Sequence, residues 1–212
     1  MKIAILGSTG FVGRVLTEKA LEKGFQIKSL VRNPDKLGTF KNRVEFIQGD
    51  ISQLDKLDEC LSGVQAVLST VPPERNTHDP EKYAKIMEDL INSIIKNGVK
   101  RFIHIGGAAH GGGENESWTF KRKLLRAFLN LSWKQGLKAK RLEWETLKKS
   151  DIDWTLVRPP RIVKGKSTEK IIADDKILTQ AKVYVDDLAD FMLDQIESKE
   201  WSKKAPLVSS IK

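Results

Sequence analysis

Cysteine and histidine are scarce in the 212-residue sequence, which has one cysteine and three histidines. A single cysteine, Cys60, excludes an internal disulfide. Since no histidine lies near it in sequence, we expect it to be a packing residue rather than a catalytic thiol. His78 and His104 show no metal-ligand spacing with any cysteine or acid pair. The sequence therefore predicts no metal site.

The sequence also lacks a long apolar run. No stretch approaches the roughly 20 apolar residues that a membrane span requires. Met1 leads directly into a short apolar strand rather than into a charged and then apolar leader. We therefore expect a cytoplasmic protein with no membrane partner. A composition of 40% hydrophobic and 31% charged residues suits one compact domain over 1–212.

Three glycines spaced three apart follow the N-terminal strand, in the order Gly7-Ser-Thr-Gly10-Phe-Val-Gly13. Gly7 permits a tight turn, Gly10 lets the backbone approach a pyrophosphate, and Gly13 lets the next helix pack closely on the sheet. Unpaired N–H groups at the start of that helix would hold the pyrophosphate. An ordinary turn is the alternative, but the strand before and the amphipathic helix after favour a dinucleotide site. We expect that site to include Gly7, Ser8, Thr9, Gly10, Phe11, Val12 and Gly13.

The second predicted strand, 26–31, ends in a cation where an NAD-specific site carries an acid. Arg32 can hold a 2′-phosphate bidentately and stack on adenine, whereas an acid would repel the phosphate. Lys36 adds a second positive charge from the same loop. We therefore predict NADP(H) as the cofactor; the alternative is that Arg32 is only a solvated loop residue.

Strand and helix patterns alternate along the chain without repeats or low-complexity linkers. Right-handed crossovers then give an α/β fold with a doubly wound parallel sheet, the NAD(P)-binding Rossmann fold. We expect all strands to join this one sheet. After the strand that precedes Gly7, strands are predicted at 26–31, 44–48, 65–71, 101–105 and 153–157. Helices are predicted after the glycines and at 52–61, 79–97, about 118–149 and 185–197, with Ser52, Asp79, Gly98, Asp186 and Asp187 at their ends.

Two further predicted strands end in residues that can line the same cleft. Asp50 follows the third strand, where its carboxylate can accept from the adenine amino group while Ile51 packs on the ring. A turn residue or helix cap is an equally good interpretation of Asp50. Thr70, Val71 and Pro72 follow the fourth strand, where they can pass beside the nicotinamide ribose. The alternative there is an ordinary proline-stiffened turn.

These segments resemble the atypical short-chain dehydrogenase/reductases: Gly7-Ser-Thr-Gly-Phe-Val-Gly13, Val31-Arg-Asn-Pro-Asp-Lys-Leu37, Gly49-Asp50, Ser150-Asp-Ile-Asp-Trp-Thr-Leu-Val-Arg-Pro-Pro-Arg161 and Val185-Asp-Asp-Leu-Ala-Asp190. Over nearly its whole length the chain is similar to the NAD(P)H-binding branch that contains biliverdin-IXβ reductase/flavin reductase and the NmrA-like proteins. The resemblance implies an NADP(H) site. It implies that the site is lined by the glycine segment, Arg32, Lys36, Asp50, Ile51, Thr70, Val71, Pro160 and Arg161.

The catalytic pair of that superfamily is incomplete in this sequence. Classical members use a tyrosine with a lysine four residues later, which lowers the pKa of the phenol so that it can act as general acid or base. Counting back from the last predicted strand places the lysine at Lys140 and the tyrosine position at Gly136. Gly107 stands where a serine or threonine commonly follows the fifth strand. The two tyrosines present, Tyr83 and Tyr184, have no lysine four residues later.

Hydride delivery to a flavin, bilin or quinone-like acceptor does not need that tyrosine, because the acceptor is already an electrophile and solvent can protonate the product. We therefore predict an NADPH-dependent reductase of a small anionic or aromatic acceptor. Lys140 could hold the nicotinamide ribose and His110 could donate a proton, or both could be ordinary solvent-facing residues. The alternative function is a catalytically silent NADP(H)-binding sensor similar to the NmrA-like proteins. An isomerase or a dehydratase is a weaker third candidate, since either would need the same tyrosine and lysine, and the tyrosine is missing.

Positive charge is concentrated in 118–149, where ten Lys and Arg residues against two Glu account for eight of the nine formal net charges. This excess would attract anions. Three tryptophans lie among the cations, but no nucleic-acid-binding module accompanies them, so we expect no nucleic-acid partner. Leu124, Phe128, Leu131 and neighbouring leucines recur at a spacing that predicts a buried helical face.

Substrate contacts are expected from two less regular segments, 106–116 and, near the C-terminus, 158–182. Glycine, serine and charge predict an exposed loop at 164–168, and the strand-like stretch 177–185 leads into the last helix. A monomer and a homodimer are both compatible with the sequence.

Overall fold

The computed structural model describes residues 1–72, 79–109, 116–168 and 170–211. Six parallel strands form its central sheet in the order β3-β2-β1-β4-β5-β6. This order confirms the predicted α/β Rossmann fold with its doubly wound sheet. The strands are β1 Lys2–Leu6, β2 Gln26–Val31, β3 Glu45–Gln48, β4 Ala66–Ser69, β5 Arg101–Ile105 and β6 Trp154–Val157.

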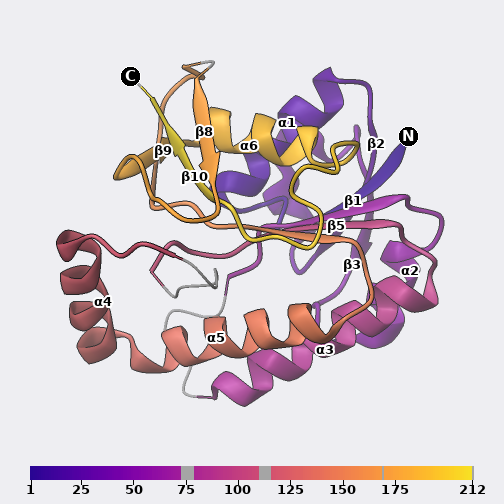
Figure 1. The fold of residues 1–212 in the computed structure, drawn as a ribbon. Coiled ribbons are helices and arrows are strands. Elements are labelled where there is room, and N and C mark those ends of the chain that lie inside the picture. Colours follow the sequence, from indigo (N-terminus) through magenta and orange to yellow (C-terminus); the bar gives the residue numbers. More distant parts are fainter. Residues whose placement is uncertain (73–78, 110–115, 169, 212) are drawn as a thin grey trace.

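Helices cover both faces of this sheet (Figure 1). On one face α1, Phe11–Glu22, packs against α6, Val185–Asp194, and on the other α3, Pro80–Lys96, lies between α2 and α5. A 3₁₀ segment follows β2, and α4 stands at one edge of the molecule (Figure 1). None of the helices in the described ranges has the length and apolarity that a bilayer crossing requires. The remaining bounds are Leu54–Leu61 for α2, Phe120–Ser132 for α4, Lys134–Lys149 for α5 and Pro34–Phe40 for the 3₁₀ segment.

The residue pattern of β1 explains its place in the middle of the sheet. Ile3 and Ile5 join the buried apolar cluster on the face of α1 and α6. Ala4 and Leu6 join the cluster on the opposite face, with α2, α3 and α5. Since side chains alternate between faces along a strand, an unbroken apolar run is buried on both sides. This central strand therefore delivers Gly7 to the carboxyl edge of the sheet, between β2 and β4.

Two small sheets correct the expectation that all strands share one sheet. The strand predicted at 177–185 is confined to 182–184, and 158–182 is more regular than expected. The short strands pair with one another, and isolated parallel bridges join Thr155 to Lys204 and Arg158 to Leu207 at the edge of the central sheet. The short strands are β7 Arg161–Val163, parallel to β9 Lys182–Tyr184, and β8 Ile171–Asp174, antiparallel to β10 Leu207–Ser210.

Asp187, predicted as an acid at a helix start, also fixes the loop around 167. Its carboxylate accepts hydrogen bonds from the hydroxyl groups of Ser167, Thr168 and Ser210 and from the N–H of Thr168. Burial by itself would raise the pKa of Asp187, but these donors lower it. The 164–168 segment is therefore held to the first turn of α6.

The long helix predicted at 118–149 is two helices. Trp133 leaves the helical region, with φ of −146° and ψ of 41°, and separates α4 from α5.

The ends predicted for α3 are confirmed. Asp79 accepts a hydrogen bond from the N–H of Lys82, and Gly98 follows the helix with a φ of 65°, which favours glycine.

The apolar side of α4 is exposed, which corrects the expectation of a buried face. Leu124, Phe128 and Leu131 are 62%, 63% and 89% exposed. The inward side of α4 carries Arg122 instead, which is buried and donates to the carbonyl oxygen of Ala108. A charged anchor, rather than the leucines, therefore decides which side of this helix faces the protein.

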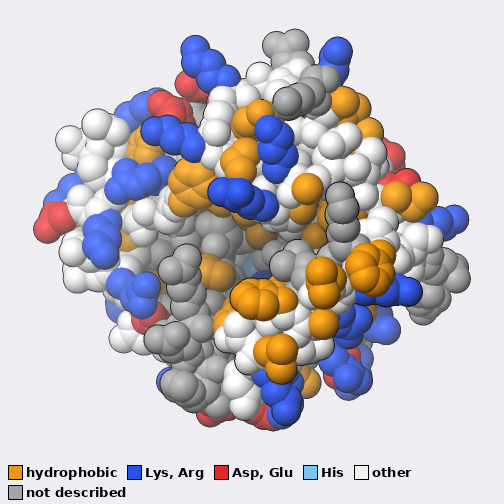
Figure 2. All heavy atoms as spheres, turned by 90° about the vertical axis from the view of Figure 1, so that its left-hand side faces the viewer, with side chains coloured by type: hydrophobic (Ala, Val, Ile, Leu, Met, Phe, Trp, Pro, Cys, Tyr) orange, Lys and Arg blue, Asp and Glu red, His pale blue; other side chains and the backbone are white. Residues whose placement is uncertain are grey.

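The interleaved tryptophans and cations of this region contact one another. The guanidinium carbons of Arg122 and Arg126 lie 4.1 and 4.9 Å from the ring centroid of Trp118, and Lys148 Nζ lies 5.5 Å from that of Trp144. Cation–π contacts thus hold two of the three tryptophans of this region against cations. Lys and Arg side chains spread over the face that carries α4 (Figure 2).

Cys60 is buried in α2, as predicted, and burial raises the pKa of its thiol to about 12. The thiolate is the reactive form of cysteine, so the folded protein should resist alkylation near pH 8. We expect iodoacetamide to label Cys60 only after unfolding in urea, with mass spectrometry as the measurement. Labelling of the folded protein at the rate of a free thiol would contradict this placement.

Candidate functional site

A cavity of about 790 Å³ opens at the carboxyl ends of β1, β2, β3 and β4. Its volume is within the range of about 300–1,000 Å³ that is usual for ligand and cofactor sites. It occupies the crevice in which open α/β sheets bind nucleotides. Ten residues predicted for the cofactor line it: Gly7, Thr9, Gly10, Arg32, Lys36, Asp50, Ile51, Thr70, Val71 and Pro72.

The glycine turn has the geometry of a phosphate cradle. Gly7 has a φ of +87°, and a Cβ there would lie 2.6 Å from Thr70 Oγ1. A Cβ at Gly13 would overlap the carbonyl group of Gly7, so only glycine lets α1 start this close to the turn. No side chain caps the first turn of α1, which also holds no acid. Its N–H groups are therefore available to an anion.

The residues between the three glycines differ in burial. Ser8 is fully buried, and its hydroxyl has no hydrogen-bond partner among the described residues. Phe11 is exposed and Val12 half-buried on the first turn of α1. The residues present thus fit a dinucleotide: the cradle excludes side chains, and a buried polar atom beside it lacks a partner.

The outer end of the cavity carries two predicted cations. The side chain of Arg32 is 80% exposed, and its Nε lies 3.9 Å from Asp50 Oδ2. Such an exposed pair is weak, so the guanidinium can turn toward an anionic ligand. Lys36 stands on the same loop, and Arg14 of α1 donates to its carbonyl oxygen. The loop is thereby tied to the helix that begins at the cradle.

Asp50 serves as a turn residue and also lines the cavity. Its Oδ1 accepts from the N–H and the hydroxyl of Ser52 at 3.0 and 2.8 Å, so α2 begins at Leu54 rather than at Ser52 as predicted. Burial by itself would raise the pKa of Asp50, but these donors and Arg32 lower it. Its carboxylate is thus an ionised acceptor at neutral pH, and the contact with adenine stays a prediction.

A second cavity of about 190 Å³ adjoins the inner end of the first. Thr70 and Pro72 line both cavities, so the two cavities share part of their wall. Lys140 of α5 lines the second cavity. The lysine that the sequence placed beside the nicotinamide ribose therefore lies in the smaller cavity, next to the larger one. The other lining residues are Ile105, Gly106, Gly107, Ala109, Trp133 and Leu137.

Lys140 belongs to a buried polar cluster that surrounds Glu143. Lys140 Nζ donates to Glu143 Oε2 at 2.8 Å and to the carbonyl oxygen of Ile105 at 3.2 Å. Tyr83 Oη donates to Glu143 Oε2 at 2.7 Å, and His104 Nε2 lies 3.1 Å from the same oxygen. The cluster joins α3, α5 and β5 next to the two cavities.

Ionisation in this cluster favours the carboxylate. Burial by itself would raise the pKa of Glu143, but the charge of Lys140 and the nearby His104 lower it well below its ordinary range. Burial first, and then the charge of Glu143, raise the pKa of Tyr83 well above its ordinary value. Tyr83 thus stays protonated and holds Glu143 rather than acting as an acid near neutral pH.

Trp133 occupies the space that a side chain at position 136 would need. A Cβ on Gly136 would overlap the indole ring of Trp133. The missing tyrosine is therefore replaced in space by an indole, which lines the second cavity without an ionisable group. A Cβ at Gly107, across the cavity, would meet no atom within 4 Å.

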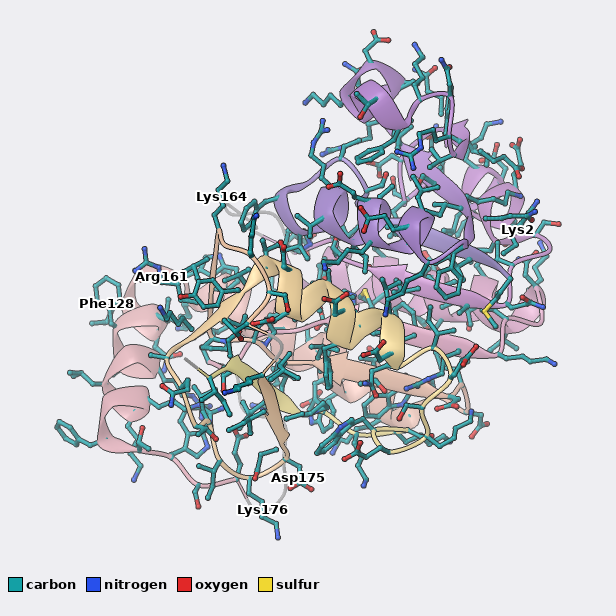
Figure 3. The ribbon with its side chains drawn as sticks, turned by 90° about the horizontal axis from the view of Figure 1, so that it is seen from above. Lys2, Phe128, Arg161, Lys164, Asp175 and Lys176 are labelled. Atoms are coloured by element: carbon teal, nitrogen blue, oxygen red, sulfur yellow. The ribbon has the colours of Figure 1, made fainter. Side chains whose placement is uncertain are left out.

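Some predicted site residues lie elsewhere. Pro160 and Arg161 line neither cavity. Arg161 begins β7, on the same side of the molecule as Phe128 and Lys164 (Figure 3). Their part in cofactor binding stays a prediction. His110 lies outside the described residues.

Three residues near the two cavities were not predicted as site residues. Tyr83 lines the first cavity from α3, and His104 and Glu143 complete the buried cluster. Glu143 follows Lys140 by three residues, a spacing that puts both on one helix face and could have indicated the pair. Tyr83 and His104 meet Glu143 only through the packing of distant segments.

Comparison with known proteins agrees with this geometry. The sequence model of the NAD(P)H-binding family matches residues 7–199. An uncharacterized chloroplastic protein of Arabidopsis thaliana is 28% identical over 217 residues, which cover 96% of this chain and 74% of that protein. A photosystem II assembly factor of Trieres chinensis is 41% identical over 71 residues, 33% of this chain and 22% of the factor. The chain thus spans less than a quarter of the factor's length in that match.

Solved structures show the same fold at low sequence identity. An anaerobilin reductase from Escherichia coli superposes with a TM-score of 0.82 at 16% identity, covering 100% of this chain and 99% of that one. A short-chain dehydrogenase/reductase from Veillonella parvula, solved in complex with NADP, gives a TM-score of 0.79 at 16% identity, covering 99% and 94%. The cradle, the cavity and the match over 7–199 lead to one conclusion: the chain belongs to the NAD(P)H-binding family.

Proposed function

We propose that the protein is an NADPH-dependent reductase that passes hydride to a flavin, bilin or quinone-like acceptor, in the cytoplasm. The observation that supports this proposal is the junction of the two cavities at Thr70 and Pro72. A nucleotide that extends from the glycine cradle would end beside a separate pocket. When two reactants are held in contact in this way, proximity and orientation contribute much of the rate acceleration, so few catalytic side chains are required.

The residues of the large cavity have separate roles in this proposal. Gly7, Gly10 and the open start of α1 would hold the pyrophosphate, and Arg32 with Lys36 the 2′-phosphate. The nicotinamide supplies the hydride. Thr70 Oγ1 donates to the carbonyl oxygens of Leu6 and Gly7, which fixes the wall beside the nicotinamide ribose. These contacts orient the cofactor toward the second cavity.

A silent NADP(H) sensor is the second candidate, and one observation favours it. Among the described residues of the second cavity, the ammonium of Lys140 is already paired with Glu143, and no phenol stands at position 136. A sensor would bind NADPH and show no oxidation with FMN, biliverdin or menadione. Absorbance at the NADPH band during incubation with each acceptor distinguishes the two candidates.

Replacing Arg32 by alanine should weaken NADPH binding about 10- to 100-fold, because a charge-assisted contact contributes about 1.5–3 kcal/mol. NADH, which lacks the 2′-phosphate, should bind nearly as before. Isothermal calorimetry with both nucleotides measures this difference. Lys41→Ala is a matched control, since Lys41 is an exposed cation of the same loop region that pairs with Asp35 outside the cavity. Equal weakening of NADPH and NADH would contradict the assignment.

A further inference from the structure

The described residues that line the second cavity contribute mostly apolar surface. Pro72, Ile105, Ala109, Trp133 and Leu137 contribute hydrocarbon or aromatic surface. The only hydroxyl among the described lining residues belongs to Thr70, which donates it to backbone carbonyl oxygens. A ligand here would gain from apolar contact and would find few polar partners.

The charge of this cavity is nearly balanced. Lys140 is the one charged residue among its described lining residues. Its ammonium lies 2.8 Å from the buried carboxylate of Glu143, which stays ionised. An anionic group in the cavity would therefore be attracted by the cation and repelled by the carboxylate behind it. Glu143 thus offsets the one charge that the 118–149 region contributes to the described lining, and an uncharged ligand suits this cavity better than a phosphate or a propionate.

The size of the cavity also limits the ligand. Its volume of about 190 Å³ is below the roughly 300–1,000 Å³ of sites that enclose drug-sized molecules. A molecule with one or two fused rings matches this space, whereas the three rings of a flavin or the four of a bilin would extend outside it. The indole of Trp133 offers a flat wall on which such a ring can stack.

Building on the proposed function, we propose that the second cavity is the acceptor site and that its substrate is a small uncharged quinone of one or two rings. The quinone takes a hydride, and with it two electrons, from NADPH, which becomes NADP⁺. One proton from water completes the hydroquinone. Trp133 stacks on the quinone ring, and Lys140 stays paired with Glu143.

Filling the cavity tests this assignment. Gly107→Leu adds a side chain where the backbone leaves open space, so the fold should tolerate it. We expect at least tenfold lower kcat/KM for menadione and less than a twofold change in the Kd of NADPH. Saturation-transfer NMR of menadione with NADP⁺ present should lose its signal in the variant. Ala127→Leu, on the exposed face of α4, is a control of similar added bulk, with three added carbon atoms against four.

Opening the cavity should have the opposite effect on large acceptors. Trp133→Ala removes the indole wall, so we expect activity with FMN or biliverdin to rise at least tenfold relative to menadione. Trp133→Phe keeps a flat ring and should retain the preference for menadione. Thermal unfolding of each variant shows whether the fold is intact.

The outcomes separate this inference from the proposed function. Reduction of FMN or biliverdin by the unmodified protein without binding of menadione would overturn the quinone site and leave the reductase. Unchanged menadione binding in Gly107→Leu would overturn the location. If the protein binds NADPH but no acceptor oxidises it, the proposed reductase function is excluded, and with it the quinone as a substrate.

Discussion

Replacing Glu143 by glutamine is expected to lower the free energy of unfolding by about 3–5 kcal/mol. Glu143 is fully buried and is the partner of Lys140, Tyr83 and His104. The substitution keeps the shape but leaves the ammonium of Lys140 buried without a counter-charge, which is the costly case for a buried ion pair. Urea denaturation followed by circular dichroism measures the change. Since the free energy of unfolding of a protein is commonly about 5–15 kcal/mol, a loss of this size should be easy to measure.

The double variant Lys140→Met with Glu143→Gln is the control for this prediction. Removing both charges should restore much of the stability lost in Glu143→Gln, because an apolar replacement of a buried pair is often neutral. If the single variant were as stable as the unmodified protein, the cluster would not be the buried ion pair described above.

The loss should also depend on pH. The pKa of Glu143 is lowered in the folded protein, so its contribution is complete above the unfolded pKa of about 4.3 and is lost as pH falls below it. The difference between the unmodified protein and Glu143→Gln should therefore be full at pH 7 and shrink below about pH 4. A difference that grows on acidification would contradict this sign.

Gly13→Ala should weaken the binding of NADPH and NADH about tenfold or more and destabilise the protein. The added Cβ would overlap the carbonyl group of Gly7 and lie 2.7 Å from its carbonyl carbon, so either α1 or the turn must move. Overpacking of this kind costs about 1–3 kcal/mol of stability. The displaced N–H groups should raise the Kd of NADPH and NADH alike, by about tenfold or more. Calorimetry with both nucleotides measures this.

Gly107→Ala controls for the loss of a glycine, because its Cβ meets no atom within 4 Å and it lies outside the nucleotide cavity. It should leave the Kd of both nucleotides within about twofold. Selective loss of NADPH in Gly13→Ala, with NADH binding intact, would contradict a role at the pyrophosphate that both share.

The nucleotide half of the molecule was predictable because its signals are local. The apolar alternation of β1, the three glycines and the cation after β2 are all read within about 30 residues, and each follows from backbone sterics or charge. Parallel strands bring their carboxyl ends to one edge, so Asp50 and Thr70 could be placed there without knowing any contact. Ten of the predicted residues do line the cavity.

The second cavity was less predictable because its walls depend on contacts between distant segments. Gly136 is visible in the sequence as a missing phenol, but only the structure shows the indole of Trp133 in its place. The break at Trp133 also separates α4 from α5, where helical periodicity alone suggested one helix. The exposed apolar side of α4 has the same origin, since the buried Arg122 decides its orientation.

The Rossmann fold, the glycine turn before α1 and the cation after β2 could be predicted from the amino-acid sequence. Backbone sterics and apolar periodicity involve residues that are close together in the sequence, so they can be recognised without a structure. The pairing of Lys140 with Glu143, the contacts of Tyr83 and His104 with the same carboxylate, and the apolar cavity beside the larger one became visible only in the folded protein. Burial and charge pairing arise between residues far apart in the chain, so no local pattern records them.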